Sequence, residues 1–122
     1  MLKQYVIIPR KPKMSTGKIA SQVAHATFMA LHNENMTYTE TQKRRKEWMK
    51  NGMCVIVLEC PSQIELMNIA KYCEQWKIPH HLYIDEGITE IPMGTATAFA
   101  TGVLDEDKQW IFSTMKLYGE KE

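Results

Sequence analysis

The sequence has no hydrophobic run that is long enough to cross a membrane. Its longest uninterrupted apolar stretch, residues 53–58, has six residues, whereas a membrane-spanning helix needs about 20. The apolar segment near the start, residues 5–8, is stopped by Pro9 and is too short for the core of a signal peptide. We therefore expect neither a membrane segment nor a secretion signal, and we expect a cytoplasmic protein.

Patterns of cysteine and metal-binding residues are also lacking. The three cysteines, Cys54, Cys60 and Cys73, form no C-x-x-C pair, and their odd number argues against a disulfide framework. The four histidines include no H-E-x-x-H motif, and the adjacent His80 and His81 would point to opposite faces of a strand. We therefore expect reduced thiols in the core, no metal site and no other cofactor.

Two familiar enzyme motifs are absent. No G-x-S-x-G sequence is present, so the usual signature of a serine nucleophile is missing. Residues 15–18 partly resemble a phosphate-binding loop, but Pro12 stands where that loop needs its first glycine and Ile19 where it needs a magnesium-binding hydroxyl. These differences exclude a P-loop nucleoside triphosphatase.

Positive and negative charges are unevenly distributed, although the net charge is only +1. Residues 1–50 carry ten Lys and Arg against three acids, and residues 51–122 carry five against eleven. The first acid in the chain is Glu34, which leaves five earlier cations without a sequence neighbour of opposite charge: Lys3, Arg10, Lys11, Lys13 and Lys18. This distribution is typical of a surface that binds anions, although neutralisation of one half by the other in the folded domain explains it equally well.

The size and the hydrophobic pattern predict one α/β domain that spans residues 1–122. A chain of 122 residues, 44% of them hydrophobic, buries a substantial core without disulfides or metals. Strands and helices alternate along the chain, which is typical of the α/β class. Strands are expected at residues 5–8, 53–58, 81–84 and 95–101, and helices after Gly17, after Pro61 and after Asp105.

Two of these elements carry more specific expectations. The continuous apolar run at residues 53–58 predicts a central strand that is covered on both faces. The last helix is expected to begin with Asp105 as its N-cap and to carry Trp110, Ile111 and Met115.

The helix after Gly17 carries a narrow polar seam. At about 100° per residue, five side chains share one stripe of this helix: Lys18, Gln22, His25, Met29 and His32. The seam adjoins an apolar face and suggests the lining of a cleft, although an exposed edge with a hydrogen-bonded core histidine remains the competing interpretation. Lys18 lies in the first turn, where the helix end already favours anions, so this cation needs an anionic partner.

A second polar cluster lies at residues 85–95. Asp85 closes an apolar strand, Gly87 and Gly94 permit unusual turns, and Thr89 and Thr95 supply hydroxyl groups. Loops at strand ends are where α/β folds build their sites. A plain turn that is capped by Asp85 is the competing interpretation.

Together the two clusters resemble the type-2 peptidyl-tRNA hydrolases of archaea and eukaryotes. Residues 14–26 are similar to that family's M-x-x-G-K-x-A-A-Q-x-x-H-A opening, and residues 85–102 are similar to its D-A-G-x-T-x-I-x-x-G-T-x-T stretch. Trp48, Gly52 and the chain end at residues 115–118 are similarly placed, so the resemblance extends over essentially the whole chain.

The resemblance implies a fold, an assembly and an activity. The fold is a single α/β domain with a four-stranded mixed sheet and helices on both faces, commonly as a homodimer. The activity is hydrolysis of the ester that joins a peptide to the 3′ ribose of tRNA, which recycles the tRNA without a metal. The site residues implied at matching positions are Lys18, Gln22, His25, Asp85, Thr89 and Thr95. The chain departs from the family pattern at Lys11, Glu86, Ile88 and Glu90.

The chemistry of these residues predicts separate roles. Asp85 orients or deprotonates a water molecule, with His25 as the competing base. Lys18 holds the oxyanion or a terminal phosphate, and the two threonines fix the geometry. Phosphate contacts to tRNA are expected from Arg10, Lys11 and Lys13, whereas the basic run at residues 43–46 is either a solvated helix face or a further RNA contact.

Two alternatives remain from the sequence. One is a member of the same fold that binds RNA or protein without hydrolysis, which the departures at Lys11 and Ile88 favour. The other is a hydrolase for a different small acyl ester or amide. Juxtaposition of Lys18 and Asp85 in one cleft is the structural observation on which the enzymatic hypothesis depends.

Overall fold

The computed structural model describes residues 1–87 and 91–120. Its elements follow the order β1 (Gln4–Pro9), α1 (Thr16–His32), α2 (Thr39–Lys50), β2 (Val55–Cys60), α3 (Gln63–Gln75), β3 (His80–Ile84), β4 (Ala96–Thr101), the 3-10 turn η1 (Glu106–Lys108) and α4 (Trp110–Ser113). The four strands form one mixed sheet in the order β2-β1-β4-β3. β1 runs parallel to β2 and antiparallel to β4, and β3 runs antiparallel to β4.

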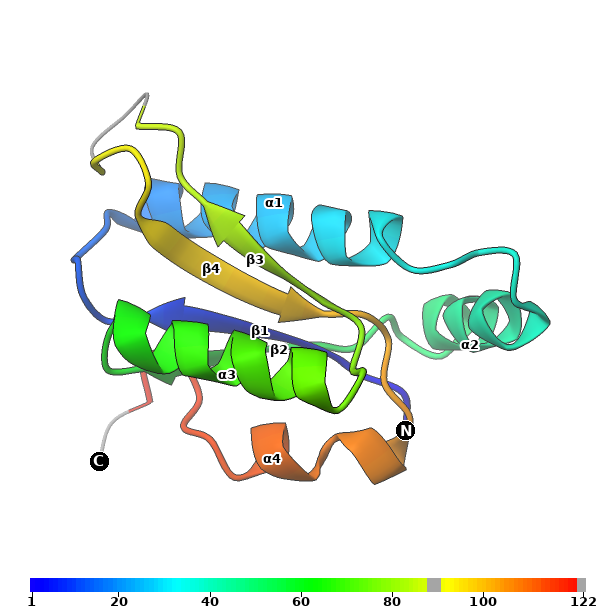
Figure 1. Ribbon diagram of the computed structural model, residues 1–122. Helices are drawn as coiled ribbons and strands as arrows, with labels where there is room; N and C mark the ends of the chain where they lie inside the picture. Colours follow the sequence, from blue (N-terminus) through cyan, green and yellow to red (C-terminus); the bar gives the residue numbers. More distant parts are fainter. Residues whose placement is uncertain (88–90, 121–122) are drawn as a thin grey trace.

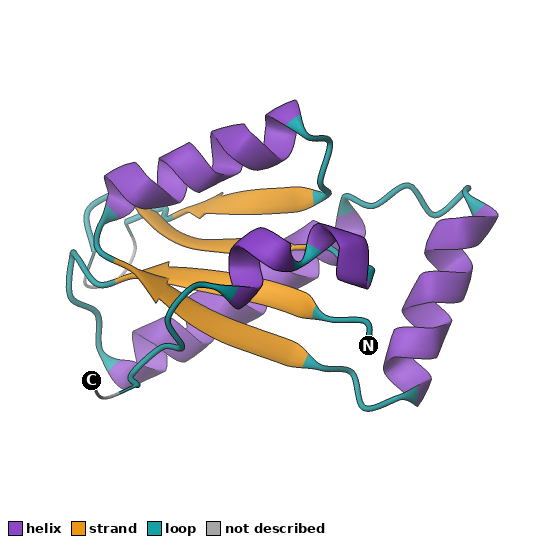
Figure 2. Ribbon diagram, turned by 90° about the horizontal axis from the view of Figure 1, so that it is seen from below, coloured by secondary structure: helices purple, strands orange, loops and turns teal. Residues whose placement is uncertain are grey.

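Helices cover both faces of the sheet, as the family resemblance implied. α1 lies along one face, and α3 and α4 lie along the other (Figure 1). α2 stands beyond the end of the sheet instead of covering it (Figure 2). The predicted α/β class, with a four-stranded mixed sheet between helices, is therefore confirmed.

The two buried central strands explain this layered arrangement. Every residue of β1 and of β4 is buried, and successive side chains of a strand point to opposite faces. Val6 and Ile8 pack with Ala26 of α1 on one side, whereas Ile7 packs with Leu66 of α3 on the other. The alanines of β4 leave room for the close approach of α1, so the first helix packs directly on the centre of the sheet.

The predicted central position of the strand at residues 53–58 is wrong. This segment contributes to β2, which lies at one edge of the sheet, while β1 and β4 occupy the centre. The apolar run is still accommodated because the end of the chain covers the outer edge of β2. The backbone N–H of Glu59 donates to the carbonyl of Lys116 at 3.0 Å, and that of Tyr118 donates to the carbonyl of Val57 at 2.9 Å.

The predicted last helix is also wrong in form. The segment after Asp105 is divided into η1 and the single turn α4, and Asp105 makes no side-chain cap. Its carboxylate lies 3.9 Å from Arg44 Nε on α2 instead. Burial of Phe112, whose ring stacks on Tyr5 with centroids 5.2 Å apart, needs only one helical turn.

The three cysteines are free thiols. Cys60 and Cys73 are buried, and Cys54 is partly exposed. Burial raises the pKa of Cys60 to about 11 and that of Cys73 to about 12. Both groups therefore stay protonated at neutral pH, whereas a reactive cysteine needs a lowered pKa.

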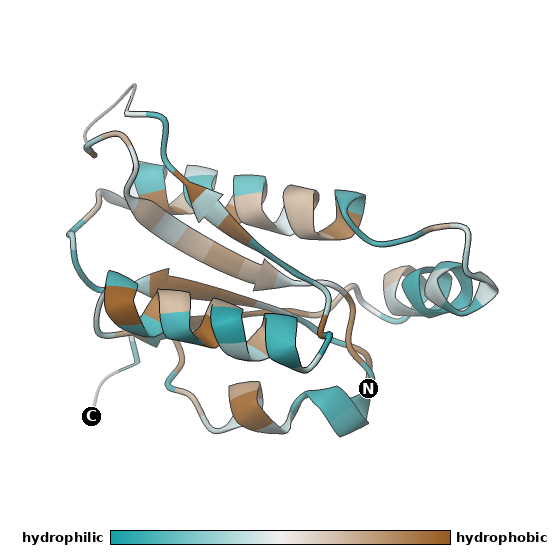
Figure 3. Cartoon of the chain, in the orientation of Figure 1, coloured by the Kyte–Doolittle hydropathy of each residue, from teal (hydrophilic) through white to brown (hydrophobic). Residues whose placement is uncertain are grey.

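None of the helices within the described residues is long and apolar enough to pass through a lipid bilayer. The helix α2 is mostly hydrophilic along its surface (Figure 3), in keeping with its basic run at residues 43–46.

Candidate active site at the start of α1

The structure brings Lys18 and Asp85 together, although 67 positions separate them in the sequence. Lys18 Nζ lies 2.7 Å from Asp85 Oδ1, and the two side chains are only 10% and 5% exposed. Lys18 comes from the first turn of α1, where its backbone N–H donates to the N-cap side chain of Ser15 at 3.2 Å. Asp85 is thus the anionic partner that a cation at a helix start requires.

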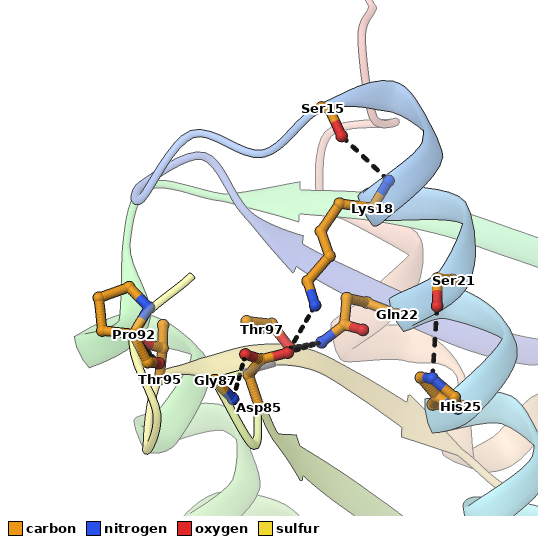
Figure 4. A network of polar contacts seen from close by, with 10 residues as sticks. All are labelled: Ser15, Lys18, Ser21, Gln22, His25, Asp85, Gly87, Pro92, Thr95 and Thr97. Atoms are coloured by element: carbon orange, nitrogen blue, oxygen red, sulfur yellow. Dashed lines mark hydrogen bonds and ion pairs between the residues drawn. The ribbon is translucent and has the colours of Figure 1, made fainter. Parts of the chain in front are cut away.

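Three hydrogen-bond donors among the described residues converge on the Asp85 carboxylate (Figure 4). Besides Lys18, Gln22 Nε2 donates to Oδ1 at 3.2 Å and the backbone N–H of Gly87 donates to Oδ2 at 2.8 Å. The hydrogen bond from Lys18, more than any other contact, lowers the pKa of Asp85 below its ordinary 3.8, against the opposing effect of burial. Asp85 is therefore ionised at neutral pH.

Gln22 connects this carboxylate to the sheet. Its side chain is buried on α1, one turn after Lys18, and its amide also donates to Thr97 Oγ1 on β4. Gln22 was predicted from the sequence as a site residue, whereas Thr97, which is fully buried, was not. Strand alternation would have placed Thr97 on the face of Phe99, which packs towards α3. The pairing of β3 with β4 is irregular at Tyr83/Ile84, where Thr97 is the extra residue, and this irregularity lets Thr97 face α1.

Gly87 has a conformation and a position that need glycine. Its φ is +77°, and an added Cβ would lie 2.7 Å from the backbone nitrogen of Met93. The absence of a side chain lets the loop turn back so that the Gly87 N–H reaches Asp85. The predicted role of this glycine in shaping the turn is therefore visible in the geometry.

Thr95 supports Asp85 through the backbone. The N–H of Asp85 donates to the carbonyl of Thr95 at 2.8 Å, and Thr95 Oγ1 donates to the carbonyl of Pro92 at 2.8 Å. The Thr95 hydroxyl thus holds the loop instead of pointing at the carboxylate. Thr89, the other predicted threonine, lies outside the described residues.

His25 lies beside the ion pair on the next turn of α1. In Figure 4 the side chains of Lys18 and Gln22 point at Asp85, while the His25 ring pairs with Ser21 Oγ at 3.3 Å. Its ring also stacks on Tyr83, with centroids 4.9 Å apart. His25 is exposed, so the competing interpretation of a core histidine is wrong.

These groups line one open pocket of about 190 Å³. Its walls are Lys18, Ser21, Gln22, His25, Tyr83, Asp85 and Glu86. Sequence reasoning placed four of these residues in the site and noted Glu86 as a departure from the family, but it missed Ser21 and Tyr83. The pocket combines an ammonium group, an ionised carboxylate and an imidazole, which are the groups that ester hydrolysis needs.

The predicted phosphate-binding residues follow β1 at the same end of the sheet. Arg10, Lys11 and Lys13 are all exposed in the loop that leads into α1. Arg10 Nε lies 3.3 Å from Glu59 Oε2, and the loop borders two further hollows, of about 470 and 430 Å³. Neither hollow includes Lys18 or Asp85, so this loop is a neighbour of the pocket and not part of it.

The basic run on α2 divides into structural and exposed members. Arg44 faces Asp105, while Arg45 donates to the carbonyl of Leu31 at 2.6 Å and pairs with Glu34. Lys43 and Lys46 are exposed, so only half of this run faces solvent fully.

A small α/β domain with a buried ion pair at an open pocket belongs to the class of α/β enzymes that place their sites at strand ends. The sequence model of one family, described as Peptidyl-tRNA hydrolase PTH2, matches residues 2–118. The chain belongs to this family.

Similar proteins agree with the family match. The chain is 37% identical over 100 residues to a protein from Thermococcus sibiricus, with 82% of each chain covered. It is 34% identical over 118 residues to one from Haloquadratum walsbyi, with 96% of this chain and 100% of the relative covered. A protein from Methanopyrus kandleri is 32% identical over 108 residues, with 88% and 90% covered. Each of the three is named peptidyl-tRNA hydrolase.

Proposed function

We propose that the chain hydrolyses the ester between a peptide and the 3′ ribose of tRNA, and that this reaction takes place in the Lys18–Asp85 pocket. The family match and the names of the relatives support the activity. The main support for this site is the distance of 2.7 Å between Lys18 Nζ and Asp85 Oδ1 at the wall of an open pocket.

Asp85 is the group that orients water. An ionised carboxylate has about four lone-pair positions, and three are taken by the donors of Lys18, Gln22 and Gly87. Oδ2 accepts only from Gly87 among the described residues, so this oxygen can accept a hydrogen bond from the attacking water. A lowered pKa makes Asp85 a weak proton acceptor, and its main contribution is therefore to position the water and stabilise developing positive charge.

Lys18 stabilises the oxyanion. Its ammonium group has three donors, of which Asp85 accepts one, so donors remain for the carbonyl oxygen that becomes negative. Such a charge is held more strongly in a partly desolvated pocket than in water. The departing ribose hydroxyl needs a proton, and His25 at the pocket wall is placed to move one, so it remains the second candidate for acid-base chemistry.

Arg10, Lys11 and Lys13 bind tRNA phosphates next to the pocket. All three are exposed at the end of the sheet that holds the site, and phosphate contacts of this kind position RNA without reading its sequence. Binding of tRNA should therefore weaken steeply as salt rises. Equal binding at low and high salt would contradict this role.

We further propose a cytoplasmic location, where tRNA is used in translation, and a homodimer. Ile64 and Met67 of α3 are 69% and 46% exposed, and they offer apolar surface to a second copy. Light scattering should give twice the mass of 14.2 kDa. A mass of 14.2 kDa at micromolar concentration would contradict the dimer.

Incubation with N-blocked aminoacyl-tRNA tests the proposed function. Loss of the ester, together with its persistence when Asp85→Asn replaces the native protein, supports the proposal. Binding without cleavage would point to a non-catalytic RNA-binding member of the fold. Neither binding nor cleavage would point to a hydrolase of another acyl compound.

A further inference from the structure

Two contacts hold the imidazole ring of His25 at the pocket wall. Ser21, one helical turn earlier on α1, places its Oγ 3.3 Å from Nε2 of the ring (Figure 4). Tyr83 of β3 stacks on the face of the same ring, with centroids 4.9 Å apart and 14° between the two planes. All three residues line the pocket that also holds Lys18 and Asp85.

The two contacts restrict different motions of the ring. His25 is exposed, and an exposed side chain ordinarily changes rotamer within nanoseconds. Stacking on Tyr83 sets the plane of the ring, and the contact with Ser21 sets which nitrogen points along the helix. Together they favour one arrangement of a side chain that would otherwise sample several.

Tyr83 is itself held in place by the core. Its side chain is half-buried and packs against the apolar cluster that includes Val6, Ile8 and Ala26. The plane that Tyr83 presents to His25 is therefore fixed from beneath by the sheet and by α1.

The contact with Ser21 leaves one ring nitrogen for chemistry. A hydroxyl group both donates and accepts, so Ser21 Oγ can pair with Nε2 whether or not this nitrogen carries a proton. Within the described part of the chain the ring has no other hydrogen-bond partner. Nδ1 is therefore the nitrogen that can exchange a proton with water or substrate.

We propose that Ser21 and Tyr83 are positioning residues that hold His25 for proton transfer during ester hydrolysis. This inference rests on the proposed function, in which the departing ribose oxygen needs a proton. Nδ1 of His25 takes the proton that the attacking water loses, and gives it to the ribose oxygen as the bond from that oxygen to the acyl carbon breaks. Neither Ser21 nor Tyr83 exchanges a proton in this step, so each acts on the rate only through His25.

A double-mutant cycle measured as kcat on N-blocked aminoacyl-tRNA tests this dependence. His25→Ala should lower kcat about 100-fold, at the low end of general acid-base catalysis. Tyr83→Leu should lower kcat about threefold to tenfold with KM unchanged, in the range that loss of one aromatic pair provides, and Tyr83→Phe should restore it. Added to His25→Ala, Tyr83→Leu should cause no further loss, whereas a merely structural role would slow both backgrounds equally.

Ser21→Ala provides a second variant that leaves the core intact, because Ser21 is exposed on α1. It should lower kcat about threefold, as expected for loss of one hydrogen bond, and it should have no effect in the His25→Ala background. Tyr72→Leu is the matched control, because Tyr72 is also half-buried but lies on α3, outside the pocket. This control should keep the native kcat.

Proton NMR tests the arrangement of the ring without turnover. The ring protons of His25 lie over the face of Tyr83 and should resonate upfield in the native protein. Tyr83→Leu should remove this shift, and Tyr83→Phe should keep it. Absence of the shift in the native protein would overturn the positioning role of Tyr83.

The kinetic outcomes separate this inference from the proposed function. Equal slowing by Tyr83→Leu in the native and His25→Ala backgrounds would overturn the inference and leave the hydrolysis standing. A native rate in His25→Ala would do the same, because Lys18 and Asp85 would then suffice. No hydrolysis by the native protein would instead defeat the proposed function, and with it this use of His25.

Discussion

Two mostly buried ion pairs, one between residues 67 positions apart and one between residues 11 positions apart, differ in what surrounds them. Lys18–Asp85 has side chains 10% and 5% exposed, and Arg45–Glu34 has side chains 21% and 4% exposed. The first pair stands at the wall of a pocket of about 190 Å³. Arg45 also donates to the carbonyl of Leu31, so the second pair fastens α2 to the end of α1.

A glycine adapts the chain to each pair, again in different ways. Gly87 has a positive φ and presents its N–H to Asp85. Gly102 makes room for the Glu34 carboxylate, whose carbon would lie 2.8 Å from an added Cβ. Burial of an ion pair is thus not sufficient to define a site. The Lys18–Asp85 pair differs from Arg45–Glu34 because it lines an open pocket, whereas Arg45–Glu34 holds α2 against the end of α1.

Lys18→Ala and Asp85→Asn should have the largest effect of any substitution here. Each removes a group that we propose to act on the water or the ester carbonyl, so we expect kcat to fall about 100-fold or more. Single-turnover hydrolysis of N-blocked aminoacyl-tRNA measures this. Hydrolysis at the native rate in both variants would remove the catalytic assignment of the pocket.

Arg45→Ala should lower stability and leave kcat unchanged, the reverse of what we expect for Lys18→Ala. It leaves Glu34 buried without its cation, which costs about 3 kcal/mol of unfolding free energy, while kcat of the folded protein stays near the native value. Urea unfolding and hydrolysis below the melting temperature separate the two quantities. If kcat fell as far as it does in Lys18→Ala, the contrast between the two pairs would be wrong.

Gly87→Ala and Gly102→Ala sharpen the same contrast with a smaller change. A positive φ and the clash with Met93 cost Gly87→Ala about 1–3 kcal/mol, and the misplaced N–H should lower kcat as well. Gly102→Ala should lower stability and leave kcat alone, because it displaces only Glu34. If Gly87→Ala and Gly102→Ala lowered kcat equally, the proposed difference between the two ion pairs would be wrong.

The smallest expected effect is on the pH dependence of stability. Donation by Lys18, and then by Gly87, lowers the pKa of Asp85 in the folded protein below its ordinary 3.8. The folded state therefore binds this proton more weakly than the unfolded state, so Asp85 contributes stability above about pH 4 and loses it as pH falls through the lowered pKa. Acid unfolding of Asp85→Asn should lack this component, and identical slopes would contradict it.

Periodicity predicted the elements better than their positions in the sheet. Alternation identified β4 and helical spacing identified α1, because both signals are local. The edge position of β2 was missed, since the cover comes from residues 116–118, and a local pattern does not record which distant segment provides it. The short length of α4 was missed because helix propensity does not show how many residues the core contacts. In the structure Phe112 is the buried residue of α4, and one turn is enough to bury it.

The site was predictable in its charged members and not in its uncharged ones. Lys18 lay where a cation needs a partner, and the family motifs pointed to Asp85. Thr97 and Tyr83 gave no comparable signal, because a threonine or a tyrosine in a strand is ordinary. Their importance depends on what α1 places opposite them.

Residues 116–118 cover the outer edge of β2, so β3 is the edge strand without such cover among the described residues. Within the described residues, β3 pairs only with β4, so strand addition by any extended segment is directed to β3. That edge belongs to β3, the strand that leads into Asp85. The closing segment of the chain thereby decides where this sheet can be extended.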